Sequence, residues 1–160
     1  MPLATPPLAS HTPLSLEFER LINRQLGGQS RVQVTQVDLY DVPDLHALFN
    51  AKRDEFSFEG KGTKTIWVFH GTREENIRPI MTGGFKVGGV DIAVANGRAF
   101  GTGVYTAVGP STPMGYGRGT NKVIFAQALV GRDQEDSFTP GQHPDWRIFK
   151  TKDQMLPRYV

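Results

Sequence analysis

Glycine and proline are spread along this whole chain, and they limit how long any helix or strand can be. There are 18 Gly and 11 Pro in 160 residues, with no repeat period and no low-complexity block. Because both residue types interrupt regular structure, the elements must be short and joined by many loops. A chain of this length fits one domain with a single core. We therefore expect one loop-rich domain of the α+β or all-β class.

The composition excludes several kinds of site. There is no Cys, which rules out disulfides and thiolate metal ligands. The net charge is only +2, and Lys and Arg form no block of the kind that binds a nucleic-acid backbone. No run of 18 apolar residues occurs, so we expect no membrane-spanning segment. We also expect no metal, because four histidines lack metal-ligand spacing: His11, His46, His70 and His143.

The start of the chain differs from the rest. Met1 to Pro13 lacks both early basic residues and an apolar core, so the segment is not typical of a signal peptide. We expect residues 1–13 to be a disordered tail and residues 14–160 to form the folded domain.

Hydrophobic periodicity predicts two helices and a strand in the first part of the domain. Apolar residues at helical spacing predict a helix over Leu14–Leu26, which Gly27-Gly28 should end. Alternation predicts a strand over Arg31–Leu39. A second helix is expected from Pro43 to about Glu55, with its inward side formed by Leu45, Leu48 and Phe49.

Strand patterns dominate the remainder. Thr65–His70 is a compact aromatic and β-branched run, which predicts a buried strand. Thr72-Arg73-Glu74-Glu75 has the form of a capping box, so a short helix should follow and end by Gly83-Gly84. Residues 85–100 and 133–145 are expected to be loops. Further strands are expected at Gly103–Ala107, Lys122–Val130, Trp146–Lys150 and Arg158–Val160.

Three motifs occur in order along the domain. Phe69-His70-Gly71-Thr72 ends a predicted strand, Gly101-Thr102-Gly103-Val104-Tyr105 opens another with Tyr116 beyond it, and Gln154-Met155-Leu156-Pro157-Arg158-Tyr159 closes the chain. Each is weak alone. Together, from about Leu14 to Val160, the chain resembles the catalytic domain of the poly(ADP-ribose) polymerase-like, diphtheria-toxin-type ADP-ribosyltransferases. The resemblance implies an α+β fold, with two mostly antiparallel sheets packed as a split sandwich and a few flanking helices.

The resemblance also implies NAD⁺ as co-substrate and a role for each motif residue. The matching histidine, His70, contacts a hydroxyl of the nicotinamide ribose, and the Gly71 backbone pairs with the carboxamide. Tyr105 and Tyr116 flank the nicotinamide by stacking. Thr72 and Asn76 match positions on the adenosine side, although Thr72 at a helix start equally fits a structural N-cap.

Two positions depart from the family pattern. Relatives usually carry a Ser three residues before the second stacking Tyr, whereas this chain has Pro113, which cannot donate a hydrogen bond. Thr112 or Ser111 could serve if the loop shifts by a residue or two. In addition, the third catalytic slot, a Glu in chain-extending relatives, falls on Trp146. An indole cannot act as a base, and the neighbouring Asp145 would point to the opposite face of a strand.

A bulky residue in the Glu slot is the pattern of mono-transferring and of inactive relatives. The leading hypothesis is therefore an NAD⁺-dependent mono-ADP-ribosyltransferase that uses a protein acceptor, with nucleic-acid ends as a second acceptor class. One alternative is an inactive relative that binds NAD⁺ or ADP-ribose or docks partners. Another is a modifier of nucleic-acid phosphate ends, although the chain offers no convincing set of pocket arginines. We expect an intracellular monomer, cytoplasmic or nuclear, without membrane contact.

Overall fold

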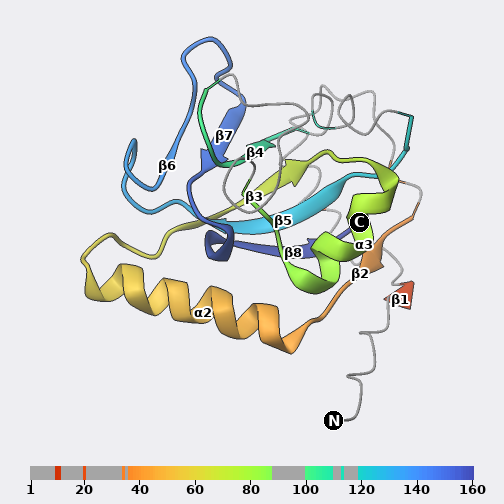
Figure 1. Ribbon diagram of the computed structural model, residues 1–160, viewed down its shortest axis with the longest axis horizontal. Coiled ribbons are helices and arrows are strands. Elements are labelled where there is room, and N and C mark those ends of the chain that lie inside the picture. The colour runs from red at the N-terminus through yellow and green to blue at the C-terminus, as the bar shows by residue number, and fades with distance from the viewer. Residues whose placement is uncertain are drawn as a thin grey trace.

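The computed structural model (Figure 1) describes residues 10–11, 20, 34, 36–87, 100–109, 113 and 119–160. Its strands follow the order β1-β2-β8-β5-β3-β4-β7-β6, and all neighbouring strands are antiparallel. The elements are β1 (Ser10–His11), β2 (Asp38–Leu39), α2 (Pro43–Phe58), β3 (Thr65–His70), α3 (Glu74–Gly83), β4 (Val104–Ala107), β5 (Ile124–Leu129), β6 (Ser137–Phe138), β7 (Trp146–Phe149), the 3₁₀ turn η1 (Lys152–Gln154) and β8 (Met155–Tyr159).

The sheet divides into two parts between β3 and β4. These two strands share the single residue pair Phe69–Ala107, whereas β3 and β5 pair at every residue from Thr65 to His70. In Figure 1, β6 and β7 lie on the opposite side of β3 from β5 and β8. The predicted α+β fold of mostly antiparallel strands is confirmed. The strands nevertheless form one eight-stranded sheet, held together at this sparsely paired junction, where two separate sheets were expected.

Helix α2 packs an apolar stripe against β5 and β8. Leu45, Phe49 and Phe56 are buried together with Leu129 and Leu156. The helix runs three residues past the predicted end at Glu55. The prediction that Leu48 faces inward is wrong, because its side chain is 47% exposed. At about 100° per residue, Leu48 lies roughly 80° from the centre of the stripe.

Helix α3 covers the other part of the core, where Ile77 and Met81 are buried. Its predicted end is confirmed: the helix stops at Gly83, and Gly84 follows at φ 90° with its N–H donating to Ile80 O. The predicted capping box is wrong. Arg73, not Thr72, occupies the N-cap position, and no side chain caps the helix there.

The central strands match their predictions, whereas the chain ends do not. Strand β3 has the predicted bounds, and β4, β5 and β7 lie within their predicted ranges. Strand β8 begins at Met155, three residues before the predicted start at Arg158, and β6 lies inside a predicted loop. Of the predicted strand at 31–39, the structure describes residues 34 and 36–39, and β2 pairs within the latter range.

The N-terminal predictions fall largely outside the described residues. Of the predicted helix at 14–26, the structure describes Arg20, which is helical. Ser10 and His11, inside the predicted disordered tail, pair with Leu39 and Asp38.

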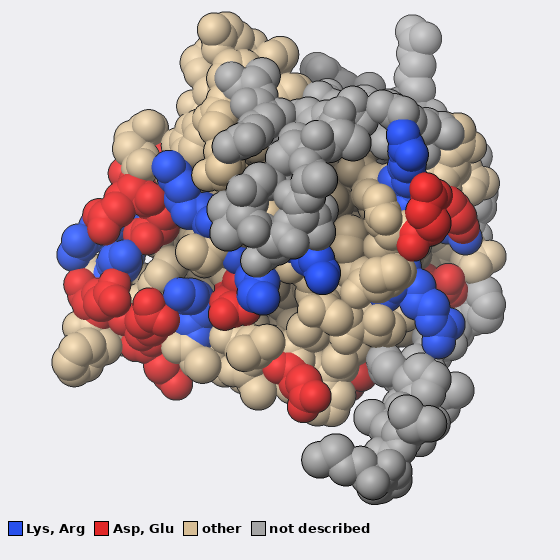
Figure 2. All heavy atoms as spheres, viewed as in Figure 1, with Lys and Arg blue, Asp and Glu red and all other residues tan. Residues whose placement is uncertain are grey.

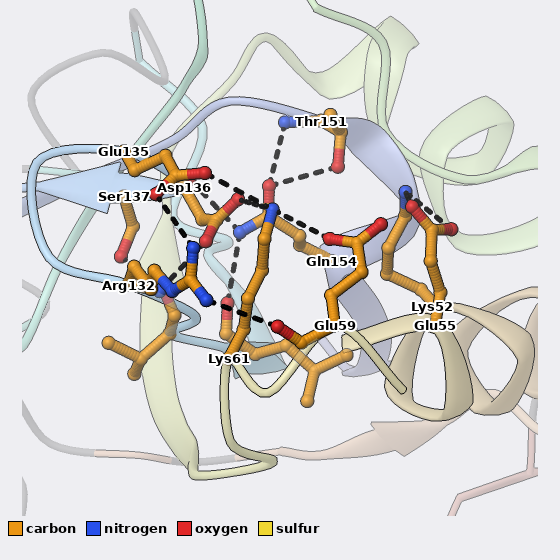
Figure 3. A network of polar contacts seen from close by, with 12 residues as sticks. Lys52, Glu55, Glu59, Lys61, Arg132, Glu135, Asp136, Ser137, Thr151 and Gln154 are labelled. Carbon is orange, nitrogen blue, oxygen red and sulfur yellow. Dashed lines mark hydrogen bonds and ion pairs between the residues drawn. The ribbon is translucent and has the colours of Figure 1, made fainter. Parts of the chain in front are cut away.

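A buried amide holds the last motif of the sequence in place (Figure 3). Gln154 is 1% exposed. Its Nε2 donates to Leu129 O at 3.1 Å and to Asp136 O at 3.0 Å, and its Oε1 accepts from the Thr151 N–H and hydroxyl at 2.9 Å each. All the hydrogen-bonding groups of this amide are therefore used to join β5, the segment before β6 and the start of β8.

Lys61 extends the same network from the loop after α2. Its ammonium lies 2.9 Å from Asp136 and 3.0 Å from Glu59. These hydrogen bonds, first that to Asp136 and then that to Glu59, hold the pKa of Lys61 above its usual range. In the Figure 2 view, basic and acidic side chains are interspersed over the described residues. Within the described residues, no helix is long and apolar enough to cross a bilayer, and no cluster of three potential metal ligands occurs.

Candidate active site

His70 ends β3 with its imidazole held from two sides. Its Nδ1 lies 2.8 Å from the Tyr105 carbonyl oxygen, and the ring meets Phe85 edge-on at 5.1 Å between centroids. Because a carbonyl can only accept, Nδ1 carries the proton. Burial lowers the pKa of His70 below 6.5, although the hydrogen bond to Tyr105 opposes this shift. The ring is therefore neutral near pH 7, and its Nε2 is an unprotonated acceptor.

This state of His70 gives a pH prediction. The pKa of His70 is lower in the folded state than in the unfolded state. As the pH falls below 6.5, the unfolded state therefore binds more protons than the folded state, which favours unfolding. The contribution of His70 to the free energy of unfolding should thus be fully present above pH 6.5 and decline as the pH falls toward the folded pKa. In an NMR titration, the His70 ring protons should shift below pH 6.5, and a midpoint above this value would contradict the assignment.

Tyr105 stands beside His70 with its hydroxyl fixed by the main chain. The hydroxyl donates to Gly101 O at 2.6 Å and accepts from the Phe100 N–H at 3.0 Å. Its ring is half-buried. The phenol is therefore anchored at both ends, by β4 and by the turn at Phe100–Gly101, so one ring face is held in a defined place.

Trp146 shares a face of the sheet with Tyr105. Tyr105 pairs with Ile148 and Ala107 pairs with Trp146 across β4 and β7, so all four side chains lie on the same face. The rings of Tyr105 and Trp146 are 6.3 Å apart, and two further rings join them to form what we call the aromatic wall: Phe100, Tyr105, His143 and Trp146. Trp146, the residue predicted to fill the third catalytic slot, therefore lies beside Tyr105.

Arg147 fixes β7 from the opposite face. Its guanidinium donates to Ser137 Oγ at 2.7 and 3.0 Å and pairs with Asp133 at 3.0 Å. These bonds join β7 to β6 and to the turn before it. Because successive side chains of a strand alternate in direction, holding Arg147 also holds Trp146 against the other face.

Gly71 is in tight contact with Pro113. A Cβ built on Gly71 would lie 1.5 Å from the Pro113 carbonyl oxygen and 2.3 Å from its carbonyl carbon. Glycine is therefore required here by the main chain of Pro113. The assignment of Pro113 to the slot of the family's serine stays a prediction. Because a prolyl residue has neither a hydroxyl nor an N–H, it offers no donor beside Gly71.

Thr72 and Asn76, predicted to lie on the adenosine side, are joined to each other. The Asn76 amide donates to Thr72 Oγ1 at 3.2 Å. Thr72 follows Gly71 directly and precedes α3, whereas Asn76 lies inside the first turn of α3. Their predicted contact with a ligand stays a prediction. Two further predicted site residues, Thr112 and Tyr116, lie outside the described residues.

A family model with the description poly(ADP-ribose) polymerase catalytic domain matches residues 15–157. The chain belongs to this family. Among curated proteins, none matches the chain significantly. Members of the poly(ADP-ribose) polymerase family are ADP-ribosyltransferases with NAD⁺ as co-substrate, so the arrangement around His70 and Tyr105 is the candidate active site of such a domain.

The glycines of the second motif of this family have structural roles here. A Cβ on Gly103 would meet Ile148 Cγ2 at 2.5 Å and Phe149 O at 2.8 Å. Gly103 therefore permits close packing of β4 on β7. Gly101 has φ 103°, a conformation that favours glycine, and its carbonyl accepts the Tyr105 hydroxyl. Packing and backbone conformation therefore explain why glycine occupies both positions, without a need for space beside a ligand.

Two members of the aromatic wall carry no distinctive signal in the sequence. Phe100 and His143 each lie in a predicted loop, and neither belongs to a motif. His143 stacks on Trp146 at 4.0 Å with an interplanar angle of 10°. A histidine three residues before a strand has no distinctive pattern, and only the fold brings Phe100 and His143 together.

Proposed function

We propose that this domain is an NAD⁺-dependent mono-ADP-ribosyltransferase that modifies a protein acceptor and releases nicotinamide. The observation that best supports the proposal is the hydrogen bond from His70 Nδ1 to the Tyr105 carbonyl. It leaves the second ring nitrogen unprotonated and holds the imidazole against the main chain of Tyr105. A ribose hydroxyl needs an acceptor of this kind.

The reaction requires stabilisation of a positive ribose. As the glycosidic bond breaks, nicotinamide departs with the bonding electron pair and the ribose gains oxocarbenium character. His70 Nε2 accepts a hydrogen bond from the ribose hydroxyl and holds the sugar as charge develops. The Gly71 N–H and carbonyl pair with the carboxamide, and the face of Tyr105 supports the nicotinamide ring. The acceptor oxygen then bonds to the anomeric carbon.

The first test of the proposal is a thermal shift with NAD⁺. Ligand that binds only the folded chain raises its melting temperature by mass action, by about 2.7 kcal/mol of stabilisation at 100 times Kd. We expect a concentration-dependent rise with NAD⁺ or with a nicotinamide-mimicking inhibitor. NADP⁺ is a matched control for unspecific nucleotide binding. An unchanged melting temperature at millimolar NAD⁺ would show that the domain does not bind NAD⁺, and it would refute the proposal.

A second test concerns the length of the product. Trp146 stands in the slot where chain-extending relatives keep a carboxylate, and an indole cannot polarise the hydroxyl of an attached ADP-ribose. We expect every modified site to carry one ADP-ribose unit. Denaturing gels of the product should show a discrete band that a poly(ADP-ribose)-cleaving hydrolase leaves unchanged. Ladders that collapse on this treatment would contradict the proposal.

The contact of Pro113 with Gly71 favours a second candidate function. Because Pro113 offers no donor, it cannot add a hydrogen bond to those that the Gly71 backbone makes with the carboxamide, which suits a relative that binds NAD⁺ or ADP-ribose without transfer. Such a chain would show the thermal shift and no covalent product.

For the transferase, we propose a monomer that acts inside the cell, in the cytoplasm or the nucleus. Nucleic-acid ends are the alternative acceptor.

A further inference from the structure

His143 presents an imidazole at the outer end of the aromatic wall. Its ring lies flat on Trp146, at 4.0 Å and 10°, and Phe100 packs edge-on against both rings at 5.6 and 5.9 Å. The wall therefore continues from Tyr105 through Trp146 to His143. One of its ends touches the main chain that orients His70, and the other carries a second titratable ring.

A short turn holds His143 in this position. The His143 N–H donates to Pro140 O at 3.0 Å, and the Trp146 N–H donates to His143 O at 3.0 Å. The turn leads directly into β7, which the Arg147 contacts fix from the other face. Among the described residues, the ring nitrogens of half-buried His143 have no hydrogen-bond partner. The fold thus orients the imidazole by stacking and leaves its nitrogens unused.

We propose that His143 is the proton acceptor for the attacking group and that this group is a side-chain hydroxyl of a protein. The inference rests on the proposed transferase function. As the acceptor oxygen bonds to the anomeric carbon, its O–H bond breaks and the proton passes to an unprotonated ring nitrogen of His143. The glycosidic electron pair leaves with nicotinamide, which departs neutral. Charge and atoms therefore balance without a further reactant.

The other groups of the wall cannot take this proton. The Trp146 indole is a donor only. The Tyr105 hydroxyl already donates to Gly101 and accepts from Phe100. Asp145 is exposed, and alternation at the start of β7 directs its side chain away from that of Trp146. His143 alone among them combines a basic nitrogen with stacking on this wall, and imidazole is the commonest general base at neutral pH.

A base at this place has a consequence for the acceptor. A carboxylate attacks as an anion and needs no proton acceptor, whereas a hydroxyl is a poor nucleophile until its proton is removed. The chain should therefore transfer to Ser or Thr hydroxyls in preference to Asp or Glu. The resulting linkage is an O-glycoside (an acetal), which withstands neutral hydroxylamine, whereas an ester linkage is cleaved by it.

The test compares two substitutions that separate stacking from basicity. His143→Phe keeps a flat ring on Trp146, and His143→Gln keeps a hydrogen-bonding group, but neither supplies a base. We expect both to lower kcat for transfer to a hydroxyl acceptor about 100-fold. The Kd for NAD⁺, measured by thermal shift, should stay within about twofold, because His143 is proposed to act on the acceptor and not to bind NAD⁺. His46→Phe, on α2, is the matched control and should leave both values unchanged.

The outcomes separate this inference from the proposed function. Reduced kcat with unchanged Kd in both variants, together with a hydroxylamine-resistant linkage, would support it. Parental kcat in His143→Phe, or a linkage that hydroxylamine cleaves, would overturn the inference and leave the transferase proposal intact. Equal loss of NAD⁺ binding and transfer in both variants would assign His143 to the wall alone and also overturn it. A parent chain that binds NAD⁺ without transfer would refute the transferase proposal, and this inference with it.

Discussion

Replacing His70 by Ala should abolish ADP-ribosyl transfer while the fold persists. In the ground state the lost hydrogen bond to the ribose is worth about 0.5–1.5 kcal/mol, which is a modest change in NAD⁺ affinity. The cost is larger in the transition state, where the same contact acts on developing charge, and losses of about 100- to 1,000-fold in kcat are typical for one such group. The kinetic signature is thus a fall in kcat much larger than the rise in Kd for NAD⁺.

His46→Ala is the matched control for this experiment. His46 lies on α2 and contacts Asp41 and Arg158. Among the described residues, it makes no hydrogen bond, ion pair or ring contact with the aromatic wall or with His70. We expect its loss to leave transfer within about twofold of the parent, because surface ion pairs contribute little to stability. Should His70→Ala transfer at the rate of His46→Ala, His70 would have no part in the reaction.

Among the glycines that the structure describes, Gly71 should be the one where an added methyl group has the largest effect. The new Cβ would lie 1.5 Å from the Pro113 carbonyl oxygen, so main chain must move by more than an ångström to admit it. Overpacking of this kind costs about 1–3 kcal/mol of stability. Because the same backbone is proposed to bind the carboxamide, NAD⁺ affinity should fall as well. Urea denaturation and NAD⁺ titration measure the two effects.

Gly83→Ala provides the comparison for Gly71→Ala. Nothing lies within 4 Å of a Cβ built on Gly83, at the end of α3. There the added methyl should leave stability unchanged or raise it by about 0.4–1 kcal/mol, through the entropy of the unfolded chain. If Gly71→Ala behaves like Gly83→Ala in both measurements, the contact with Pro113 is not as tight as described.

Local pattern predicted the centre of the sheet well. Thr65–His70 is a dense aromatic and β-branched run between turn residues, and it forms β3 with those bounds. β5 and the end of α3 followed from similarly clear signals. In these segments the local preference and the tertiary environment agree, which is the condition under which sequence patterns are reliable.

Predictions failed where the local sequence allowed a side chain either of two environments. Thr72 fits an N-cap, yet it accepts from Asn76 while Arg73 occupies the cap position. Leu48 fits a helical apolar spacing, yet the stripe that packs on Leu129 and Leu156 is centred on other positions. Both outcomes depend on how the helix docks, which residues close in sequence do not determine.

The candidate site combines predictable and unpredictable parts. The motif residues His70, Gly71 and Tyr105 were found because they recur together with family spacing. Their geometry was not predictable, since the bond from His70 to the Tyr105 carbonyl joins residues 35 apart in sequence. The same is true of the Gly71–Pro113 contact, which joins residues 42 apart. The stacking of His143 on Trp146 is a local contact over three residues, but no sequence motif signals it.

Mass spectrometry of the intact chain after incubation with NAD⁺ and a protein acceptor tests the central claim most directly. The transferase account predicts that acceptor, or the chain itself, gains single ADP-ribose units, with one nicotinamide released for each unit and none in His70→Ala. Unmodified protein and no nicotinamide release at NAD⁺ concentrations that saturate the thermal shift would contradict it.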